Sequence, residues 1–344
     1  MTKNQTGEGQ ALYSRLNRRK YLVPLCFCVL CLITLVADVM TGPAMLQVGE
    51  VLDCLFRPGT ADPNSQVIVR QIRLPVALMA LAIGCALGSS GAVMQTILHN
   101  PLASPYTLGV GAGAAFGASL AIVWGFGSVG TSLSAFLFSM GICLIIYVMG
   151  RKHNLSAGSM VLSGIALLFL FEALRALIQY GSTEEENQAI VFWSFGSLQK
   201  TTWGKLGITA AVSAVCLPLL LKDSWQYTAL LMGDEKAESL GIRVNHVKLR
   251  AFLIISLLSA AAVCFTGTIG FIGLAGPHVA RMLVGDEQRF YILTSALSGM
   301  VLLSLASILS KVIIPGIVYP IGIITSLIGV PFFFILVLRR RGGR

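Results

Sequence analysis

The sequence predicts an all-α polytopic membrane protein of about ten transmembrane helices, with some helices short or broken and both termini in the cytoplasm. Hydrophobic residues make up 55% of the 344 residues and charged residues only 12%, with a mean hydropathy of +0.80. A soluble domain carries roughly twice that charged share. Apolar runs of about 20 residues, each long enough to cross about 30 Å of hydrocarbon, recur along the whole chain. A transmembrane barrel would instead show alternating segments of about ten residues.

The apolar runs define the expected spans in order. We expect them at 21–40, 74–97, 106–124, 128–149, 157–180, 204–221, 247–266, 271–285, 291–313 and 321–338, the third and eighth being short or irregular. The first run follows a basic stretch, as a signal peptide does, but it is about 20 residues long and no clear cleavage site follows, so we expect it to be retained. Residues 1–20 then form a cytoplasmic segment, and residues 21–344 form one transmembrane domain with a cytoplasmic loop at 222–250.

The positions of the cations set the orientation. With the N-terminus inside, 18 of the 25 Lys and Arg residues fall on the cytoplasmic side, including the RRRGGR sequence at the C-terminus. This bias follows the positive-inside rule, and an odd number of spans would break it. The rule explains the formal charge of +10 without nucleic acid. Outside, we expect a long loop at 41–72 and a short amphipathic helix at 181–203, where Trp193 and Trp203 would anchor in the interface.

The segment HNPLASPYTLGVGAGAAFG, at 99–117, predicts a break between two spans. Residues that precede a proline avoid helical angles. Asn100, Pro101 and Pro105 should therefore end the second span, and a new helix should begin near Tyr106. The residues Gly109, Gly113 and Gly117 are four apart, which predicts a face that packs closely against another helix.

A second interruption lies in GTIGFIGLAGPHVAR, at 267–281, and we expect a helix to start near Pro277. His278 follows it and is interpreted as a hydrogen-bonded structural residue. Irregular backbone at membrane depth survives only where it is buried or lines a water-filled cavity. Broken spans commonly lie on the substrate route of transporters, so these interruptions favour a transporter.

The chain offers no cofactor site. Gly109, Gly111 and Ala114 fit GxGxxA, but a membrane span precedes them and residues 128–140 hold no acid, so the dinucleotide motif is excluded. The only Gly-Lys pair, at 204–205, is not part of a P-loop. Seven of the eight cysteines lie in apolar runs; Cys26, Cys28 and Cys31 have no His nearby, so we expect no metal site. The sequence shows no constellation of His or acidic residues that would indicate the active site of an enzyme.

Five segments together resemble one family. They are RQIRLP at 70–75, GAVMQTILHNPLASPYTLGVGAGAAFG at 91–117, LLMGDEKAESLGIRV at 230–244, GTIGFIGLAGPHVARMLVGDE at 267–287 and PIGIITSLIGVPFFFILVLRR at 320–340. The chain resembles the permease subunits of type II ABC importers for ferric siderophores, haem and vitamin B12, from about residue 20 to its end. The resemblance implies a bacterial cytoplasmic (inner) membrane protein that forms a homodimer or a pseudo-symmetric heterodimer.

The resemblance also implies partners. Two separate ATPase subunits would bind ATP and Mg²⁺, and an extracytoplasmic binding protein would deliver the cargo. Ferric siderophore is the expected cargo on family frequency, with haem and corrinoid left open. A secondary transporter or channel is the rival class; it would favour mid-membrane coupling carboxylates, of which only Glu172 qualifies.

The inside loop is the expected coupling segment. Residues 225–232 can form a short helix that presents apolar residues, Gly233 ends it, Asp234 caps a second helix and Gly241 closes that one. The alternative is a solvated loop with interfacial character. The residues expected to contact the ATPase are Leu230, Leu231, Gly233, Asp234, Ala237, Leu240 and Gly241.

The outer face is expected to dock the binding protein. The resemblance places Arg70 and Arg73 against its acidic residues, with Lys311 as a third cation; contact with lipid headgroups is the alternative. The chain departs from the family pattern at Ser307 and Lys311, where Asp and Arg are frequent, and at Val318, where Glu is frequent. These departures leave the details of docking open.

Charges within the spans are few. Glu172 and Arg175 lie three apart on one helix face, where they should neutralise each other against a neighbouring helix, because unpaired intramembrane charges are costly. A direct role in the pathway is the second interpretation. Asp38, at the outer end of the first span, is expected to be solvated.

Overall fold

The computed structural model describes residues 3–57, 59, 61–152 and 157–341, and the regular elements within these ranges are all helices. Among the described residues, seven helices are long and apolar enough to span a membrane: α1 (Lys3–Met40), α4 (Leu74–Ile97), α6 (Gly127–Lys152), α7 (Ala157–Gly181), α9 (Trp203–Lys222), α12 (Val244–Thr266) and α14 (Gln288–Val312). Three shorter apolar helices complete the ten expected spans: α5 (Val110–Val123), α13 (Ile272–Val284) and α15 (Ile321–Arg341).

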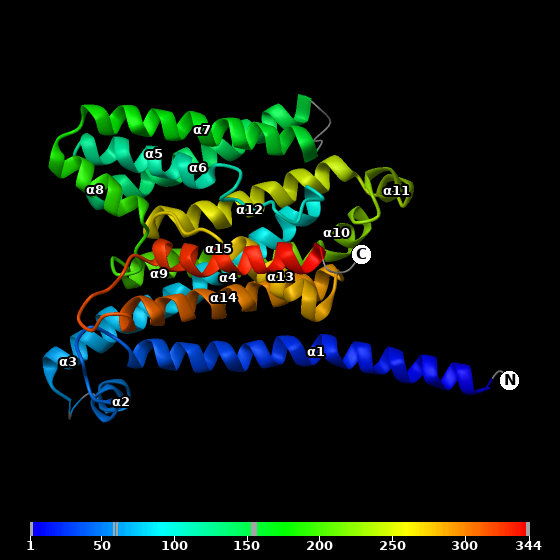
Figure 1. Ribbon diagram of the computed structural model, residues 1–344, viewed down its shortest axis with the longest axis horizontal. Helices are drawn as coiled ribbons and strands as arrows, with labels where there is room; N and C mark the ends of the chain where they lie inside the picture. The colour runs from blue at the N-terminus through cyan, green and yellow to red at the C-terminus, as the bar shows by residue number, and fades with distance from the viewer. Residues whose placement is uncertain (1–2, 58, 60, 153–156, 342–344) are drawn as a thin grey trace.

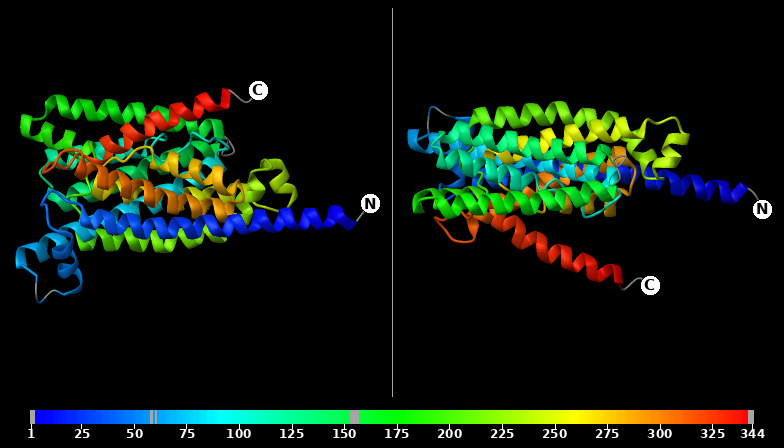
Figure 2. Two further views of the ribbon diagram at one scale, coloured as in Figure 1. Left: turned by 60° about the horizontal axis from the view of Figure 1, so that its bottom comes forward. Right: turned by 90° about the horizontal axis from the view of Figure 1, so that it is seen from above.

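The two ends of the bundle differ. Both chain termini lie at one end, beside the short helices α10 (Ser224–Leu230) and α11 (Asp234–Ser239) (Figure 1). The opposite end carries α2 (Val48–Phe56), α3 (Pro63–Val67) and α8 (Glu184–Ser194), and Figure 2 shows the same division from two other sides. The bias of Lys and Arg identifies the end with the termini as cytoplasmic. Residues 1–2 and 342–344, including Arg344, lie outside the described residues.

Three helices form the centre of the bundle. The apolar windows of α4, α12 and α14 are 83%, 72% and 61% buried, whereas those of the other long helices are 22–33% buried. Glycines bring α4 and α14 together: a Cβ atom on Gly84 would lie 2.4 Å from the Gly299 carbonyl oxygen, and one on Gly88 would lie 2.2 Å from that of Ser295. Small residues permit this close approach, which is how helices gain packing contacts in lipid.

The second span begins earlier than expected. It starts at Pro63 rather than at residue 74, because α3 continues through a π-helical segment, Ile68–Arg73, into α4 without a break. The carboxylate of Asp62 caps α3 by accepting from the backbone N–H groups of Asn64 and Ser65. Pro63 follows at the first helical position, which suits its fixed φ.

The bounds of the two interruptions also differ from those expected from the sequence. The connection between α4 and α5 covers residues 98–109, so the new helix begins at Val110 and not near Tyr106. The helix α13 begins at Ile272, after Phe271 in a left-handed conformation. Pro277 therefore lies inside α13 rather than at its start, and the break itself is the segment 267–271.

Candidate functional site

Three breaks between helices that are far apart in the sequence meet in the outer half of the bundle. They involve residues 194–197, from the last residue of α8 onward, residues 266–268, from the last residue of α12 onward, and residues 320–322, which lead into the first turn of α15. Backbone hydrogen bonds join them: Ser197 N donates to Thr266 O at 2.7 Å, Ile321 N to Gly196 O at 3.1 Å, and Gly322 N to Phe195 O at 3.0 Å. The hydroxyl of Thr268 also donates to the Ser194 carbonyl. The backbone polar groups freed by the breaks are thus satisfied inside the protein, as membrane depth requires.

Glycines make this junction possible. A Cβ atom on Gly196 would lie 2.6 Å from Thr268 O, one on Gly267 2.2 Å from Trp193 O, and one on Gly322 2.4 Å from Phe195 O. Each neighbour is a backbone atom that cannot rotate away. Gly196 and Gly322 were not predicted as site residues, because a single glycine between apolar residues gives no signal of what it faces.

A cavity of about 320 Å³ borders this junction. Its lining is mostly small or apolar, with the hydroxyls of Tyr106, Ser194, Thr268 and Ser326 as its polar side-chain groups. Tyr106 comes from the connection 98–109, so both predicted interruptions contribute to one cavity. No group of three or more His, Cys, Asp or Glu residues that could hold a metal occurs in the described part of the chain.

The charged pair of α7 lies beside the same junction. Arg175 forms an ion pair with Glu172, three residues away, and its other terminal nitrogen donates to Ser194 Oγ at 2.9 Å. Ser194 is the last residue of α8. The pair therefore neutralises itself and also ties α7 to the end of the neighbouring helix. The side chains are 23% and 41% exposed for Arg175 and Glu172, so the pair is not sealed in the core.

The predicted helix face of α5 lies against two neighbours. Gly113 and Gly117 face α6, where added Cβ atoms would lie 2.4 Å from Ile142 Cδ1 and 2.6 Å from the Ser134 carbonyl oxygen. Gly109, just before α5, faces α7 instead, and a Cβ atom there would lie 3.1 Å from the backbone of Leu168. This face is thus enclosed by protein rather than by lipid.

The inside loop forms two short helices, α10 and α11, joined at Gly233. Gly233 has φ +100° and ψ 152°, a combination that is accessible essentially only to glycine. Gly241, with φ +83°, follows the end of α11. Asp234 does not cap α11 with its side chain; its carboxylate instead accepts from Lys248 Nζ at 2.5 Å, and the Lys248 side chain is only 3% exposed. The carboxylate of Asp234, which we expected to cap α11, is thus paired with the buried ammonium of Lys248.

The apolar residues of this loop divide differently from the prediction. Ala229, Leu230 and Ala237 are buried within the subunit, because α10 packs onto α4 and α14 and α11 packs onto α12. Leu231 is partly buried. The exposed apolar residues are Trp225, Met232 and Leu240, with exposed fractions of 70%, 49% and 57%. Of the predicted contact residues, Leu240 is the large apolar side chain that is exposed.

Polar contacts fasten α10 to the spanning helices. A ring nitrogen of His99 lies 2.7 Å from the Leu230 carbonyl oxygen, and Gln288 N donates to Thr228 Oγ1 at 3.4 Å. The buried phenol of Tyr227 anchors the middle of α10, and burial, followed by the charge of Asp223, raises its pKa. A displacement of α10 would therefore reach the inner ends of α4 and α14 directly.

The outer arginines have structural partners. Arg70 donates to the carbonyl oxygens of Cys54 and Leu55 at 2.8 and 2.9 Å. Arg73 is 3% exposed and donates to the carbonyl oxygens of Val39, Met40 and Ala44. The two arginines hold the outer loop and the end of α1 against the second span. Arg73 is thus not available to a docking protein in this conformation, because its guanidinium is enclosed by these carbonyls.

Asp38 and Lys311 form a buried ion pair, which corrects two expectations. Lys311 Nζ lies 2.6 Å from Asp38 Oδ1, and the side chains are 3% and 0% exposed. Ser307 Oγ donates to the same carboxylate at 3.0 Å. The expectation that Asp38 is solvated is wrong, because the packing of α1 against α14 places it opposite Ser307 and Lys311. Lys311 is correspondingly not an exposed docking cation.

These features define a polytopic membrane permease: the described residues form ten apolar helices, a cavity borders the point where three breaks meet, and two short helices lie at the cytoplasmic end. The FecCD transport family model matches residues 30–339, and the chain belongs to this family. The chain is 36% identical to the molybdate import system permease protein MolB of Haemophilus influenzae over 92% of this chain and 95% of that protein.

Two further similarities agree with this assignment. The chain is 37% identical to the hemin transport system permease protein HmuU of Yersinia pestis over 79% of this chain and 84% of that protein. It is 34% identical to a metal-chelate type ABC transporter solved in an inward-facing conformation, with a TM-score of 0.82 over 92% of this chain and 99% of that chain. The protein is therefore a multi-pass permease subunit of an ABC importer in the cytoplasmic membrane and is not itself an enzyme. Its family implies a complex with ATPase subunits and a binding protein.

Proposed function

We propose that this permease moves an iron chelate, a ferric siderophore in the first instance, from a binding protein into the cytoplasm. The observation that carries the proposal is the cavity at the junction of the three breaks. Its polar groups are hydroxyls and backbone atoms, which suit a metal that crosses inside its chelator and needs no protein ligands. The similarity to a metal-chelate type transporter supports a chelate as cargo. Haem is the alternative, favoured by the similarity to the hemin permease, and a corrinoid is a further one.

Uptake into vesicles tests the cargo. The permease is reconstituted with its ATPase subunits and its binding protein, and uptake of a ferric siderophore, haem, a corrinoid and molybdate is compared with and without ATP. We expect ATP-dependent uptake of the siderophore. Uptake of haem or molybdate instead would reassign the cargo, whereas uptake without the ATPase subunits would indicate a secondary transporter.

We further propose that the surface of Trp225, Met232 and Leu240 contacts an ATPase subunit, which binds the ATP and Mg²⁺ that this chain does not. Two permease subunits, identical or pseudo-symmetric, would present two such surfaces. Large apolar side chains are costly to leave in water and are typical of an interface core. The contacts of α10 with α4 and α14 then provide a route by which movement of the ATPase reaches the spanning helices.

A substitution at Gly233 tests this coupling. Gly233→Ala adds one methyl group into open space, so any effect arises from backbone strain, of order 1–3 kcal/mol at such a conformation. We expect ATP-driven uptake to fall several-fold while the permease still inserts and remains folded. Gly204→Ala is the matched control, because that glycine is helical and also faces open space. Unchanged uptake and ATPase association in Gly233→Ala would contradict the coupling role.

A further inference from the structure

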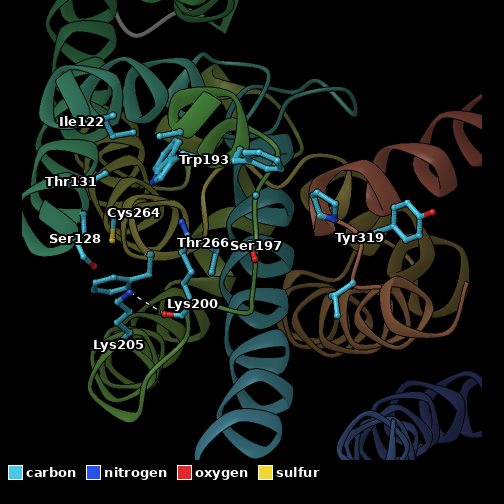
Figure 3. Close-up of a pocket in the computed structure, with 17 residues that line it drawn as sticks. Ile122, Ser128, Thr131, Trp193, Ser197, Lys200, Lys205, Cys264, Thr266 and Tyr319 are labelled. Atoms are coloured by element: carbon cyan, nitrogen blue, oxygen red, sulfur yellow. Dashed lines mark hydrogen bonds between the residues drawn. The ribbon is translucent and has the colours of Figure 1, made fainter. Parts of the chain in front are cut away.

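A second, larger cavity of about 670 Å³ lies near the outer end of the bundle (Figure 3). Its lining comes from the outer ends of α5, α6, α9 and α12, from α8 and the segment that follows it, and from residues 318–320 before α15. Both α6 and α9 pack on α12 rather than extensively on each other, so the cavity occupies the space between two spanning helices. Its volume falls in the range of about 300–1,000 Å³ that is usual for small-molecule sites.

Two lysines give this cavity a positive charge. Lys200 and Lys205 both line it, and Lys205 Nζ donates to the Lys200 carbonyl oxygen at 3.0 Å. Figure 3 draws this contact as a dashed line, below Ser128 and Thr131. No carboxylate lines the cavity, and neither lysine takes part in an ion pair among the described residues. An ammonium has three N–H donors, so the contact within the pair leaves donors for an anion.

The rest of the lining is of two kinds. Hydroxyl groups of Ser128, Thr131 and Ser132, on the first turns of α6, line the cavity. Those of Thr131 and Ser132 donate to the carbonyl oxygens of Gly127 and Ser128, and they would have to turn away from these oxygens to donate to an anion that is held by the lysines. Apolar and aromatic side chains, including Phe192, Trp193 and Phe265, form much of the remaining wall. A cavity with a cationic side and an apolar side fits an amphiphilic anion better than a small inorganic ion.

The position of the cavity favours a membrane source for such an anion. Trp203, at the first residue of α9, is 43% exposed beside the lysines, and tryptophan is enriched where the headgroups of a bilayer lie. We propose that Lys200 and Lys205 bind the phosphate group of an anionic phospholipid of the outer leaflet, with its glycerol and upper acyl chain against the aromatic wall. This cavity shares no lining residue with the cavity of about 320 Å³, although both border the junction of the breaks, and the proposal does not depend on which cargo is carried.

Native mass spectrometry of the full-length permease tests the site. The protein is titrated with phosphatidylglycerol or with zwitterionic phosphatidylcholine, and bound lipid is counted. We expect the parent to bind phosphatidylglycerol more tightly than phosphatidylcholine. The double variant Lys200→Gln with Lys205→Gln should bind phosphatidylglycerol more weakly, by about fivefold for each lysine removed, as expected for one cation near a lipid phosphate. Lys222→Gln, at the cytoplasmic end of the same helix, is the matched control and should bind as the parent does.

A parallel arm with inorganic phosphate distinguishes the source of the anion. If millimolar phosphate displaced phosphatidylglycerol from the parent but not from the double variant, the two lysines would still form an anion site, but its ligand would be a soluble phosphate. Equal binding of phosphatidylglycerol by the parent and the double variant would overturn the proposal. The proposal would also be overturned if the double variant changed association with the binding protein but did not change lipid binding. Thermal unfolding in neutral detergent, expected to be unchanged, verifies that both variants are folded.

Discussion

Asp38 and Lys311 are two charged residues that the fold keeps inside the membrane by pairing them. Each side chain is nearly inaccessible, and Ser307 donates a second hydrogen bond to the carboxylate, beside that from Lys311. Breaking a buried pair by removing one partner leaves an uncompensated charge, which costs about 3–5 kcal/mol. Since the pair joins α1 to α14, it fixes how the first helix lies on the bundle.

We predict that Asp38→Leu lowers the thermal unfolding temperature of the purified permease much more than the double variant Asp38→Leu with Lys311→Met does. The double variant removes both charges and leaves apolar side chains of similar size, which is often nearly neutral. The measurement is thermal unfolding in detergent.

The control is the pair Lys20–Glu287, whose side chains are 31% and 41% exposed. Lys20→Met breaks this pair and should cost less than about 1 kcal/mol, because exposed pairs contribute little. If Lys20→Met and Asp38→Leu shifted the unfolding temperature equally, burial of the pair would not be what makes it important.

At the scale of elements, the packing of α5 on α6 depends on glycine. Ser134 Oγ donates to the Gly117 carbonyl oxygen at 2.6 Å, which shows how closely the helices approach. We predict that Gly117→Leu reduces stability and uptake more than Gly113→Leu does. A Cβ on Gly117 meets a backbone oxygen, whereas one on Gly113 first meets the flexible end of Ile142. Overpacking of this kind typically costs about 1–3 kcal/mol.

The matched control lies on α6 itself. Gly141 has nothing within 4 Å of an added Cβ, so Gly141→Leu should leave folding and uptake as in the parent. Thermal unfolding and vesicle uptake are measured for all three variants. A loss in Gly141→Leu as large as in Gly117→Leu would indicate that this region responds to any added bulk, not to the α5–α6 contact.

At the scale of the whole molecule, the even number of spans makes a topological prediction. Asn64, in α3 at the outer end of the second span, and Glu238, in α11, are both exposed and lie at opposite ends of the bundle. A membrane-impermeant maleimide added to intact spheroplasts should label Asn64→Cys, and it should label Glu238→Cys only after the membrane is opened. Labelling of both, or of neither, in intact spheroplasts would contradict the assignment of the two ends.

Much of this architecture could be predicted from local sequence. Apolar runs predicted the spans, since crossing hydrocarbon demands length and low charge of each segment by itself. The prolines of the 98–109 connection predicted a break, because proline restricts its own backbone and that of the residue before it. The positions at Gly233 and Gly241 were predicted as helix ends for a similar reason, and both residues have positive φ.

Partnership between distant residues was decided by the tertiary structure. The sequence determined that Arg70, Arg73 and Lys311 lie near the outer face, but it could not show that carbonyl groups and Asp38 enclose two of them. It determined that residues 225–241 form two short helices, but not that Leu230 faces inward while Trp225 faces outward. Local chemistry sets where a helix starts, ends and spans; which groups are buried depends on contacts across hundreds of residues, and only the packed helices fix those contacts.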